Sequence, residues 1–311
     1  MLDQETIRSF IEVAECQNFS RAAEKLHKTT ATISYRIKTL EDSIGTQLFI
    51  RTTRSVNLTP AGEYLLERCR QWHDWLGSMP DELRQISQGA EHQVNIVINN
   101  LLYDPIVVAD LLGHLKAQYP FTQFHISRQV FMGVWDALLN EDCHLAIGAN
   151  GSEALENTIN VLPIGKIDWI FAIAPHHPLA NATQPLPDGL LRQYPAINVQ
   201  DTARHLAKRI AWKLAGQQEI VVPDMRCKLA CQLRGTGIGF LPLSICQQYL
   251  ANGQLIQKQV YHERQPSILS LAWSSHRCGE VVKSIIALFQ AQDELVTGFT
   301  PNIYSLYPQN K

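Results

Sequence analysis

Small hydroxyl-bearing side chains, one phenol and one ammonium group gather in residues 29–38, which read Thr-Thr-Ala-Thr-Ile-Ser-Tyr-Arg-Ile-Lys. If this segment is helical, its two isoleucines share one face, and Ala31, Tyr35 and Lys38 point to the opposite face. A face of small and polar groups can enter the major groove of DNA, where hydroxyl, methyl and phenol groups meet base edges. A plain three-helix bundle with a polar surface is the alternative.

The charge around this segment is positive, although the whole chain has a formal net charge of −2. Seven basic and three acidic residues lie between Arg21 and Arg54, which gives a local net charge of +4. A hairpin predicted over residues 48–58 would place Arg51 and Arg54 at its tip, where guanidinium groups suit phosphate or minor-groove contacts. The pattern indicates a nucleic-acid surface, with an ordinary solvated turn as the alternative.

Patterns that could support catalysis or metal binding are weak. The glycine-rich residues 235–239 follow a predicted helix and lack a following Gly-Lys-Ser/Thr, which favours a helix end over a nucleotide loop. His176 and His177 are adjacent and would point in opposite directions, which favours a surface turn over a metal site. The seven cysteines form no Cys-x-x-Cys pair. We therefore expect no catalytic residue, no metal and no cofactor; an α/β enzyme or a metabolite-binding module with a regulatory N-terminal domain is the alternative.

Three helices and a hairpin must position residues 29–38. Residues 4–16 carry apolar side chains at helical spacing, and Ser20 is the expected N-cap of a short second helix. Either Thr29 or Thr30 would cap the third helix. The predicted order is helix, turn, helix and hairpin.

A long helix predicted after residue 62 carries an apolar seam with alternating spacings of four and three residues. Its members are Leu65, Cys69, Trp72, Leu76, Met79, Leu83 and Ile86. A heptad seam requires a partner helix and therefore predicts a dimer. Pro80 interrupts the seam, and we expect a kink or a restart there, with Ser78 as the new cap.

From residue 94 onward, short apolar runs alternate with helical stretches, which indicates an α/β fold with parallel strands. Predicted strands cover residues 94–99, 122–127, 144–148, 168–174, 196–199, 219–222, 237–241 and 268–273. Predicted helices cover residues 104–118, 131–140, 186–193, 202–213, 224–234, 243–251 and 279–291. The length of 311 residues predicts two or more domains. The sequence shows no signal peptide and no membrane-spanning stretch, so we expect a cytoplasmic protein.

Residues 19–27, 34–41, 45–51 and 58–62 together resemble the winged helix-turn-helix of LysR-type transcriptional regulators. Residues 176–180 and 237–242 are similar to the effector domain of that family. The resemblance implies a DNA-binding domain over 1–59, a linker and dimerisation helix over 60–90, and an effector-binding domain over 91–311. That last domain would be periplasmic-binding-protein-like, with one lobe of about 91–162 and 268–292 and another of about 163–267.

The resemblance also implies two sets of site residues. The DNA-contacting set is Thr29, Thr30, Ala31, Ser34, Tyr35 and Lys38 in the helix, with Arg51 and Arg54 in the wing. The effector-contacting set is Asn99, Asn100, Leu101, Phe131, Met132, Ala149, Asn198 and Asp224. Adjacent asparagines at a strand end suit a small polar ligand, with capping and turn formation as the alternative.

The function implied by the resemblance is sequence-specific regulation of transcription. Partners would be promoter DNA, a small-molecule effector bound between the two lobes, a second or further copies in a homodimer or homotetramer, and RNA polymerase; a membrane is not expected. Residues 95–102 and 120–135 are most similar to family members that control allantoin utilisation. This similarity implies an activator of a catabolic operon.

Overall fold

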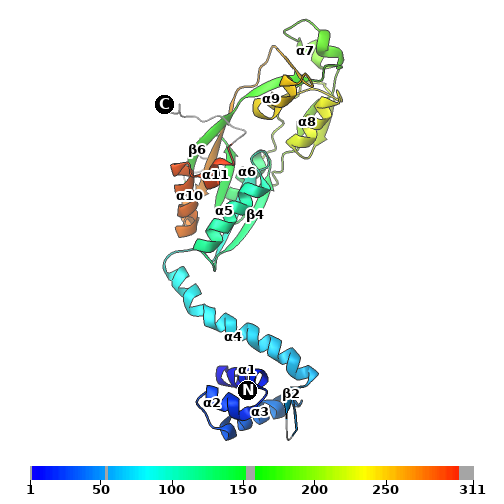
Figure 1. Ribbon diagram of the computed structural model, residues 1–311. Helices are drawn as coiled ribbons and strands as arrows, with labels where there is room; N and C mark the ends of the chain where they lie inside the picture. Colours follow the sequence, from blue (N-terminus) through cyan, green and yellow to red (C-terminus); the bar gives the residue numbers. More distant parts are fainter. Residues whose placement is uncertain (1, 53–54, 152–157, 301–311) are drawn as a thin grey trace. The chain divides into compact units, whose positions relative to one another are not determined.

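The computed structural model describes residues 2–52, 55–151 and 158–300 of the chain (Figure 1). The chain divides into two compact units, Met1–Ser87 and Gln88–Lys311. Of the predicted site residues, Arg54 lies outside the described residues.

The N-terminal unit consists of three packed helices, a two-stranded hairpin and one long helix. Its elements are α1 (Gln4–Cys16), α2 (Phe19–Lys25), α3 (Thr30–Ile44), β1 (Phe49–Arg51), β2 (Val56–Leu58) and α4 (Pro60–Ser87). Phe10, Ile33 and Ile37 are fully buried in the core of this unit, as their helical spacing predicts. Strands β1 and β2 pair antiparallel, which confirms the predicted hairpin.

Side-chain caps fix where α2 and α3 begin. The Asn18 carboxamide oxygen accepts hydrogen bonds from two backbone N–H groups, including that of Ser20 at 2.8 Å, so α2 begins at Phe19. The prediction of Ser20 as the cap is wrong, because asparagine caps a helix as well as serine does and stands two residues earlier. The Thr29 hydroxyl accepts from the backbone N–H of Thr32 at 3.2 Å, which confirms Thr29 as the cap of α3.

Helix α4 runs through Pro80 as one element, so the predicted restart is wrong. Proline removes a single helical hydrogen bond, whose acceptor would be the Leu76 carbonyl. The Ser78 hydroxyl donates to the Trp75 carbonyl at 3.0 Å and does not cap a new helix.

The apolar seam of α4 divides into two parts. Cys69 is buried and Leu65 packs against the core of the same unit. Beyond them, the exposed fractions are 42% for Trp72, 39% for Leu76, 58% for Leu83 and 41% for Ile86. Only this second part of the seam is available to a partner helix.

The C-terminal unit contains a five-stranded sheet in the order β4-β3-β5-β12-β6. Its strands are β3 (Gln93–Asn99), β4 (Gln123–Gln129), β5 (Leu145–Asn150), β6 (Ile159–Ile167) and β12 (Ser267–Ser274). Strand β3 pairs parallel with β4 and β5, as predicted. Strand β12 runs antiparallel to β5 and β6, so the sheet is mixed and not wholly parallel.

Helices cover both faces of this sheet (Figure 1). They are α5 (Pro105–Gln118), α6 (Met132–Asn140), α10 (Glu280–Ala291) and α11 (Glu294–Thr297). Ile96 and Ile98 pack in one core with α5 and α10, whereas Val97 packs in another core with α6. Successive strand residues face opposite sides, so β3 supplies both cores.

A second lobe contains a three-stranded antiparallel sheet, β10-β7-β11, and a parallel pair, β8-β9. Its strands are β7 (Trp169–Ile173), β8 (Ala196–Val199), β9 (Glu219–Val222), β10 (Phe240–Pro242) and β11 (Ile256–Lys258), and its α-helices are α7 (Asp188–Leu191), α8 (Met225–Leu233) and α9 (Leu243–Ala251). The chain enters this lobe after β6 and leaves it before β12. The predicted two-lobed α/β fold is confirmed.

Residues 202–213 form no helix, contrary to the prediction. Backbone N–H groups of this segment donate to the carboxylates of Asp201 and Asp136 instead of to helical carbonyls. Strand β6 was not predicted, because Pro163 is a strand breaker except at a sheet edge, where β6 lies. Within the described ranges, every helix is too short or too polar to cross a bilayer.

Candidate functional site

The outward face of α3 carries the predicted DNA-contacting side chains. Thr30, Ala31, Tyr35 and Lys38 are exposed, and Tyr35 exposes 72% of its surface. Ser34 is partly buried and Thr29 is exposed at the cap. The opposite face buries Ile33 and Ile37, so the helix is held from one side and presents small and polar groups on the other.

Much of the positive charge predicted around α3 is already paired within the unit. Arg36 forms ion pairs with Glu5 and with Asp3. The other internal pairs are Lys25–Glu12 at 3.1 Å and Lys28–Glu5 at 3.8 Å. Among the residues that the structure describes in this segment, Arg21 and Lys38 are the cations without an ion pair. The local net charge of +4 therefore overstates the charge available to DNA. The acids that pair with Lys25, Lys28 and Arg36 lie before residue 21 and were not included in that sum.

Arg51 holds the wing against the helices. One Glu41 carboxylate oxygen accepts from the backbone N–H groups of Leu48 and Phe49, and the other accepts from the Arg51 guanidinium at 3.0 Å. The guanidinium carbon lies 4.6 Å from the Phe19 ring centroid. These contacts join β1 to α2 and α3. The role of Glu41 has no sequence signal, because an acid and an arginine ten residues apart form no recognisable pattern.

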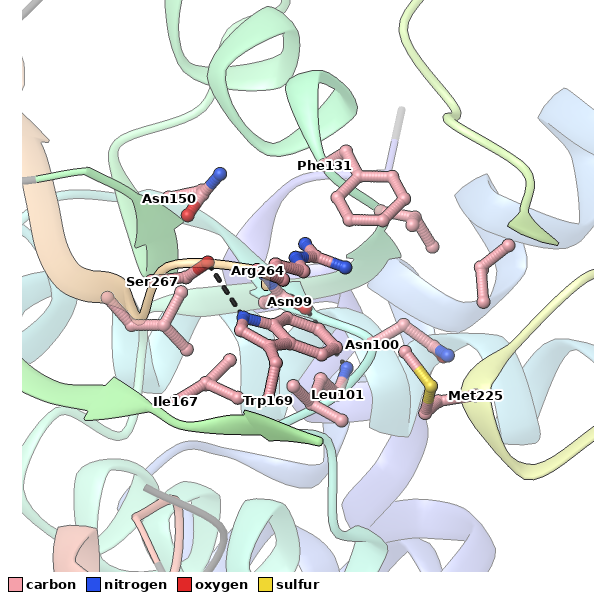
Figure 2. Close-up of a pocket in the computed structure, with 13 residues that line it drawn as sticks. Asn99, Asn100, Leu101, Phe131, Asn150, Ile167, Trp169, Met225, Arg264 and Ser267 are labelled. Carbon is pink, nitrogen blue, oxygen red and sulfur yellow. Dashed lines mark hydrogen bonds between the residues drawn. The ribbon is translucent and has the colours of Figure 1, made fainter. Parts of the chain in front are cut away.

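A cavity in the C-terminal unit holds four of the eight predicted effector residues (Figure 2). Its lining is Asn99, Asn100, Leu101, Val130, Phe131, Asn150, Ile167, Trp169, Val199, Met225, Arg264, Ser267 and Leu269. It lies where β3, β5 and β8 end, as expected for a site outside the carboxyl ends of strands. Its volume of about 40 Å³ has room for roughly three water-sized groups.

The four other predicted residues miss the lining by one position. The lining contains the sequence neighbour of each one: Phe131 beside Met132, Asn150 beside Ala149, Val199 beside Asn198, and Met225 beside Asp224. Of these neighbours, Phe131 was also predicted. Ala149 is fully buried in a core, and Asn198 donates to the Trp212 carbonyl and to Glu219. Alternate strand residues face opposite sides, so Ala149 and Asn198 point away from the cavity that the next residue of each strand lines.

The two adjacent asparagines have different roles. The Asn99 side chain donates to the Gly148 carbonyl at 2.8 Å and accepts from the Leu101 N–H at 3.0 Å, which is turn formation. The Asn100 side chain makes no hydrogen bond within the described residues and borders the cavity. Asn150 supplies a second carboxamide there, and its backbone carbonyl accepts from Trp135.

Sequence reasoning missed the aromatic and cationic part of the cavity. The Arg264 guanidinium carbon lies 3.5 Å from the Trp169 ring centroid, and the indole N–H donates to the Ser267 hydroxyl at 2.9 Å (Figure 2). Burial lowers the pKa of Arg264 to about 10, so the group is charged at neutral pH. Arg264 follows β11 in a polar segment that reads as an ordinary surface loop, and no pattern marks it.

A wider cavity of about 780 Å³ borders the first and shares Asn100, Leu101 and Met225 with it. Asp224 lies here, and its carboxylate accepts from the Cys227 N–H at 2.7 Å as the cap of α8. Two acids and two arginines line this second cavity, so its charges balance: Asp104, Asp224, Arg128 and Arg226.

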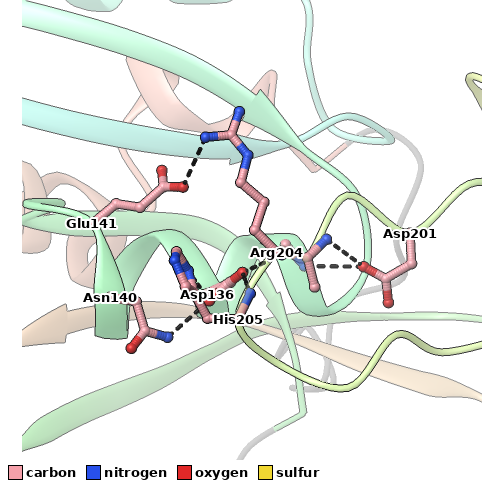
Figure 3. Close-up of polar contacts among 8 residues, drawn as sticks. Asp136, Asn140, Glu141, Asp201, Arg204 and His205 are labelled. Atoms are coloured by element: carbon pink, nitrogen blue, oxygen red, sulfur yellow. Dashed lines mark hydrogen bonds and ion pairs between the residues drawn. The ribbon is translucent and has the colours of Figure 1, made fainter.

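Asp201 joins the second lobe to the first at the start of α6 (Figure 3). Its carboxylate accepts from the backbone N–H groups of Met132 at 3.3 Å and Gly133 at 3.2 Å. A helix N-terminus attracts negative charge, and Asp201 supplies it from within the chain. A Cβ on Gly133 would lie 2.1 Å from the Thr202 hydroxyl, so glycine is required for this close approach.

Asp136 on α6 holds the same segment of the second lobe. Its carboxylate accepts from the backbone N–H groups of Arg204 and His205 and from the Asn140 carboxamide (Figure 3). Burial alone would raise the pKa of Asp136, but these donors outweigh it and lower the pKa to about 2.

We expect the contribution of Asp136 to stability to depend on pH. Its pKa is lower in the folded protein than the unfolded value of 3.8, so the stabilisation is complete above pH 4 and is lost as the pH falls toward 2. Urea unfolding of the wild type and of Asp136→Asn should therefore differ most at neutral pH, and the difference should shrink toward pH 2. A difference that is independent of pH would contradict the ionised role of this carboxylate.

Comparison with known proteins gives concordant results for both units. Residues 5–63 match the family model of a bacterial regulatory helix-turn-helix protein, lysR family, and residues 87–293 match the LysR substrate binding domain. Within residues 2–52, 55–151 and 158–300, no cluster of three metal-ligating side chains is present.

Individual relatives and solved structures are similar over most of the chain. The HTH-type transcriptional activator AllS of Salmonella typhimurium is 54% identical over 299 residues, which are 96% of this chain and 97% of that protein. The protein of the same name from Klebsiella pneumoniae is 59% identical over 256 residues, 82% of this chain and 95% of that protein. The structure of the Corynebacterium glutamicum OxyR C206 mutant has a TM-score of 0.58 at 22% identity and covers 95% of this chain and 94% of that one. That likeness shows the fold.

Proposed function

The chain belongs to the LysR family of bacterial transcriptional regulators, and from this premise we propose that it activates a catabolic operon when an effector occupies the cavity at Asn100. Its similarity to AllS proteins supports the role of an activator. The resemblance of residues 95–102 and 120–135 to regulators of allantoin utilisation supports that pathway. A function at promoter DNA requires a cytoplasmic location. We also propose residues 1–59, 60–90 and 91–311 as the DNA-binding, linker and effector-binding domains.

The observation that carries this function is the outward face of α3. A capped helix presents Thr30, Ala31, Tyr35 and Lys38 from a helix-turn-helix core. Its buried side carries Ile33, Ile37 and Leu40. Recognition helices read base edges from such a face. We propose Thr29 and Ser34 as flanking contacts, and Arg54 as a wing contact.

The structure-based role of Arg51 differs from the wing contact that the family resemblance implies. Its guanidinium pairs with Glu41 and stacks on Phe19, although 37% of the side chain is still exposed. We propose that Arg51 orients the wing and contacts phosphate only with the part that stays exposed. Replacing Arg51 would therefore disturb the fold of the wing together with its charge.

Tyr35→Ala and Arg21→Ala separate base reading from phosphate contact. We expect Tyr35→Ala to weaken binding to the specific promoter by about ten- to a hundredfold, since a good base contact is worth about 1–3 kcal/mol, and to leave non-specific binding nearly unchanged. Arg21→Ala should weaken both and reduce the salt slope by about 1. Gel-shift titrations of DNA upstream of the gene over a range of salt concentrations measure both effects.

Tyr64→Ala is the matched control, because Tyr64 on α4 is also an exposed tyrosine, at 63%. It should bind the promoter as the wild type does. No binding of the wild type to upstream DNA at low salt would reject the proposed function. Equal, salt-independent losses from Tyr35→Ala and Arg21→Ala would reject the two roles.

We propose a homodimer formed through the exposed part of the α4 seam, with a homotetramer as the larger assembly. The four exposed apolar side chains at Trp72, Leu76, Leu83 and Ile86 support this proposal, because isolated helices rarely leave such a stripe in water. Two copies would present two recognition helices to two half-sites. As an activator, the assembly would then contact RNA polymerase.

A further inference from the structure

We propose that the effector is a small organic acid whose carboxylate binds the Arg264 guanidinium, with hydrogen-bonding groups that meet Asn100 and Asn150. This inference rests on the proposed effector role of the cavity. It assigns the chemical class of the ligand and the residue that recognises its charge.

Arg264 is placed to receive an anion. Its guanidinium stacks on the Trp169 ring face, and among the described residues it has no ion pair and no hydrogen bond. A stacked guanidinium keeps its five N–H donors at its edge, in a fork that matches a carboxylate. The hydrogen bond from Trp169 to Ser267 fixes the indole, so the guanidinium is held in place before a ligand arrives.

Lys228 is a buried basic group in the same lobe. It is 1% exposed, and a Cβ built on Gly239 would lie 3.2 Å from its ammonium group. Burial and repulsion from Arg264 lower the pKa of Lys228 to about 7. Neither group has a carboxylate within ion-pair distance in the described part of the chain. With this pKa, Lys228 is protonated in about half of the molecules at neutral pH, and an anion bound at Arg264 would favour its protonated form.

A helix N-terminus that borders the same cavity already has its anion. The N-terminus of α6 borders the cavity through Phe131, but its Met132 and Gly133 N–H groups donate to Asp201. An incoming carboxylate would have to displace Asp201 there. At Arg264 it displaces no ion pair or hydrogen bond among the residues that the structure describes.

The shape of the site indicates how such a molecule would lie. The inner cavity of about 40 Å³ accommodates a group the size of a carboxylate. The carboxamides of Asn100 and Asn150 make no hydrogen bond to any residue that the structure describes, so they can hydrogen-bond to atoms beside that carboxylate. The wider cavity of about 780 Å³ borders it at Asn100, Leu101 and Met225 and would take the rest of the molecule. A short acid with an amide at its other end would place its carboxylate in the inner cavity and its amide in the wider one.

Succinamate and its neutral counterpart succinamide test the charge requirement. Thermal shift and calorimetric titration of the full chain, at constant ionic strength, should show that succinamate raises the melting temperature and that succinamide has little effect. Arg264→Met should weaken succinamate binding by about ten- to a hundredfold, as expected for losing a charge-assisted contact. The affinity of Arg264→Lys for succinamate should lie between those of the wild type and Arg264→Met, because lysine keeps the positive charge but lacks the forked N–H donors of the guanidinium.

Arg234→Met is the matched control, since Arg234 is an exposed arginine at the end of α8. It should bind succinamate as the wild type does. Should Arg264→Met fail to fold, the succinamate affinities of Arg264→Lys and Asn100→Leu are compared with that of the wild type instead. Equal binding of succinamate and succinamide, equal binding by the wild type and Arg264→Met, or no anion-dependent stabilisation at millimolar concentration would each overturn the inference.

Gel shifts on the same samples distinguish this inference from the proposed function. A wild type that binds promoter DNA but no acid leaves the regulator in place and overturns only the ligand class. A wild type that binds succinamate through Arg264 but no promoter DNA supports the ligand class and overturns the regulator.

Discussion

Asp201→Ala is expected to lower the free energy of unfolding of the C-terminal unit by about 3–5 kcal/mol, because it removes one buried carboxylate from four donors. The donors are the backbone N–H groups of Met132, Gly133, Ala203 and Arg209, at 2.8–3.3 Å. Asp201 itself is 4% exposed. Urea unfolding followed by circular dichroism measures the change.

The size of this effect follows from where the four donors lie. Two belong to the first turn of α6 in one lobe, and two belong to the segment of the other lobe that fails to form a helix. Without the carboxylate, the donors in the buried region lack an acceptor, and each such group costs about 1–3 kcal/mol. The α6 N-terminus also loses the negative charge that offsets its dipole.

Asp142→Ala provides the comparison with an exposed acid of the same unit. Asp142 pairs with Arg277 at 2.9 Å, but its side chain is 88% exposed. A surface pair of this kind contributes about 0–1 kcal/mol, so this variant should unfold close to the wild type. If Asp201→Ala lowered the free energy of unfolding as little as Asp142→Ala, water would satisfy the four donors. The contact between the lobes would then be stable without the Asp201 carboxylate.

The elements with regular periodicity could be predicted from the sequence, because their burial pattern is local. Helix α3 begins directly after the predicted cap Thr29, and strand β3 lies within one residue of its predicted bounds at each end. Residues 202–213 could not be predicted, because their N–H groups bond to Asp136, a residue far away in the chain. A polar side chain that replaces a helical carbonyl leaves no periodic signal.

The candidate site was predictable in place but not in chemistry. The family resemblance led to residues that line one cavity, Asn100 and Phe131 among them, and their contact with an effector stays a prediction. The Arg264–Trp169 stack joins the segment before β12 to the start of β7, and only the three-dimensional fold brings them together. Similarly, the sequence suggested that Arg51 is available to contact DNA, whereas in the structure its guanidinium pairs with Glu41.

Leu76→Glu is expected to dissociate the proposed dimer and to weaken promoter binding by about a hundredfold or more. Leu76 lies between Trp72 and Leu83 on the exposed part of the α4 seam. A carboxylate there would be buried without a partner in each copy, and the cost is counted twice in a symmetric interface. A separated copy engages one half-site and loses the gain of binding two together, which commonly reaches a hundredfold to ten-thousandfold.

Ser78→Glu is the control for this change, because it adds the same acid to the same helix about 200° away from Leu76. It should keep both the dimer and promoter binding. Light scattering after size-exclusion chromatography gives the mass, and gel shifts give the affinity. A dimer that survives Leu76→Glu with unchanged promoter affinity would show that the second part of the seam is covered by something other than its own copy. Loss of the dimer with unchanged affinity would show instead that one recognition helix is sufficient, and the two-half-site arrangement would be wrong.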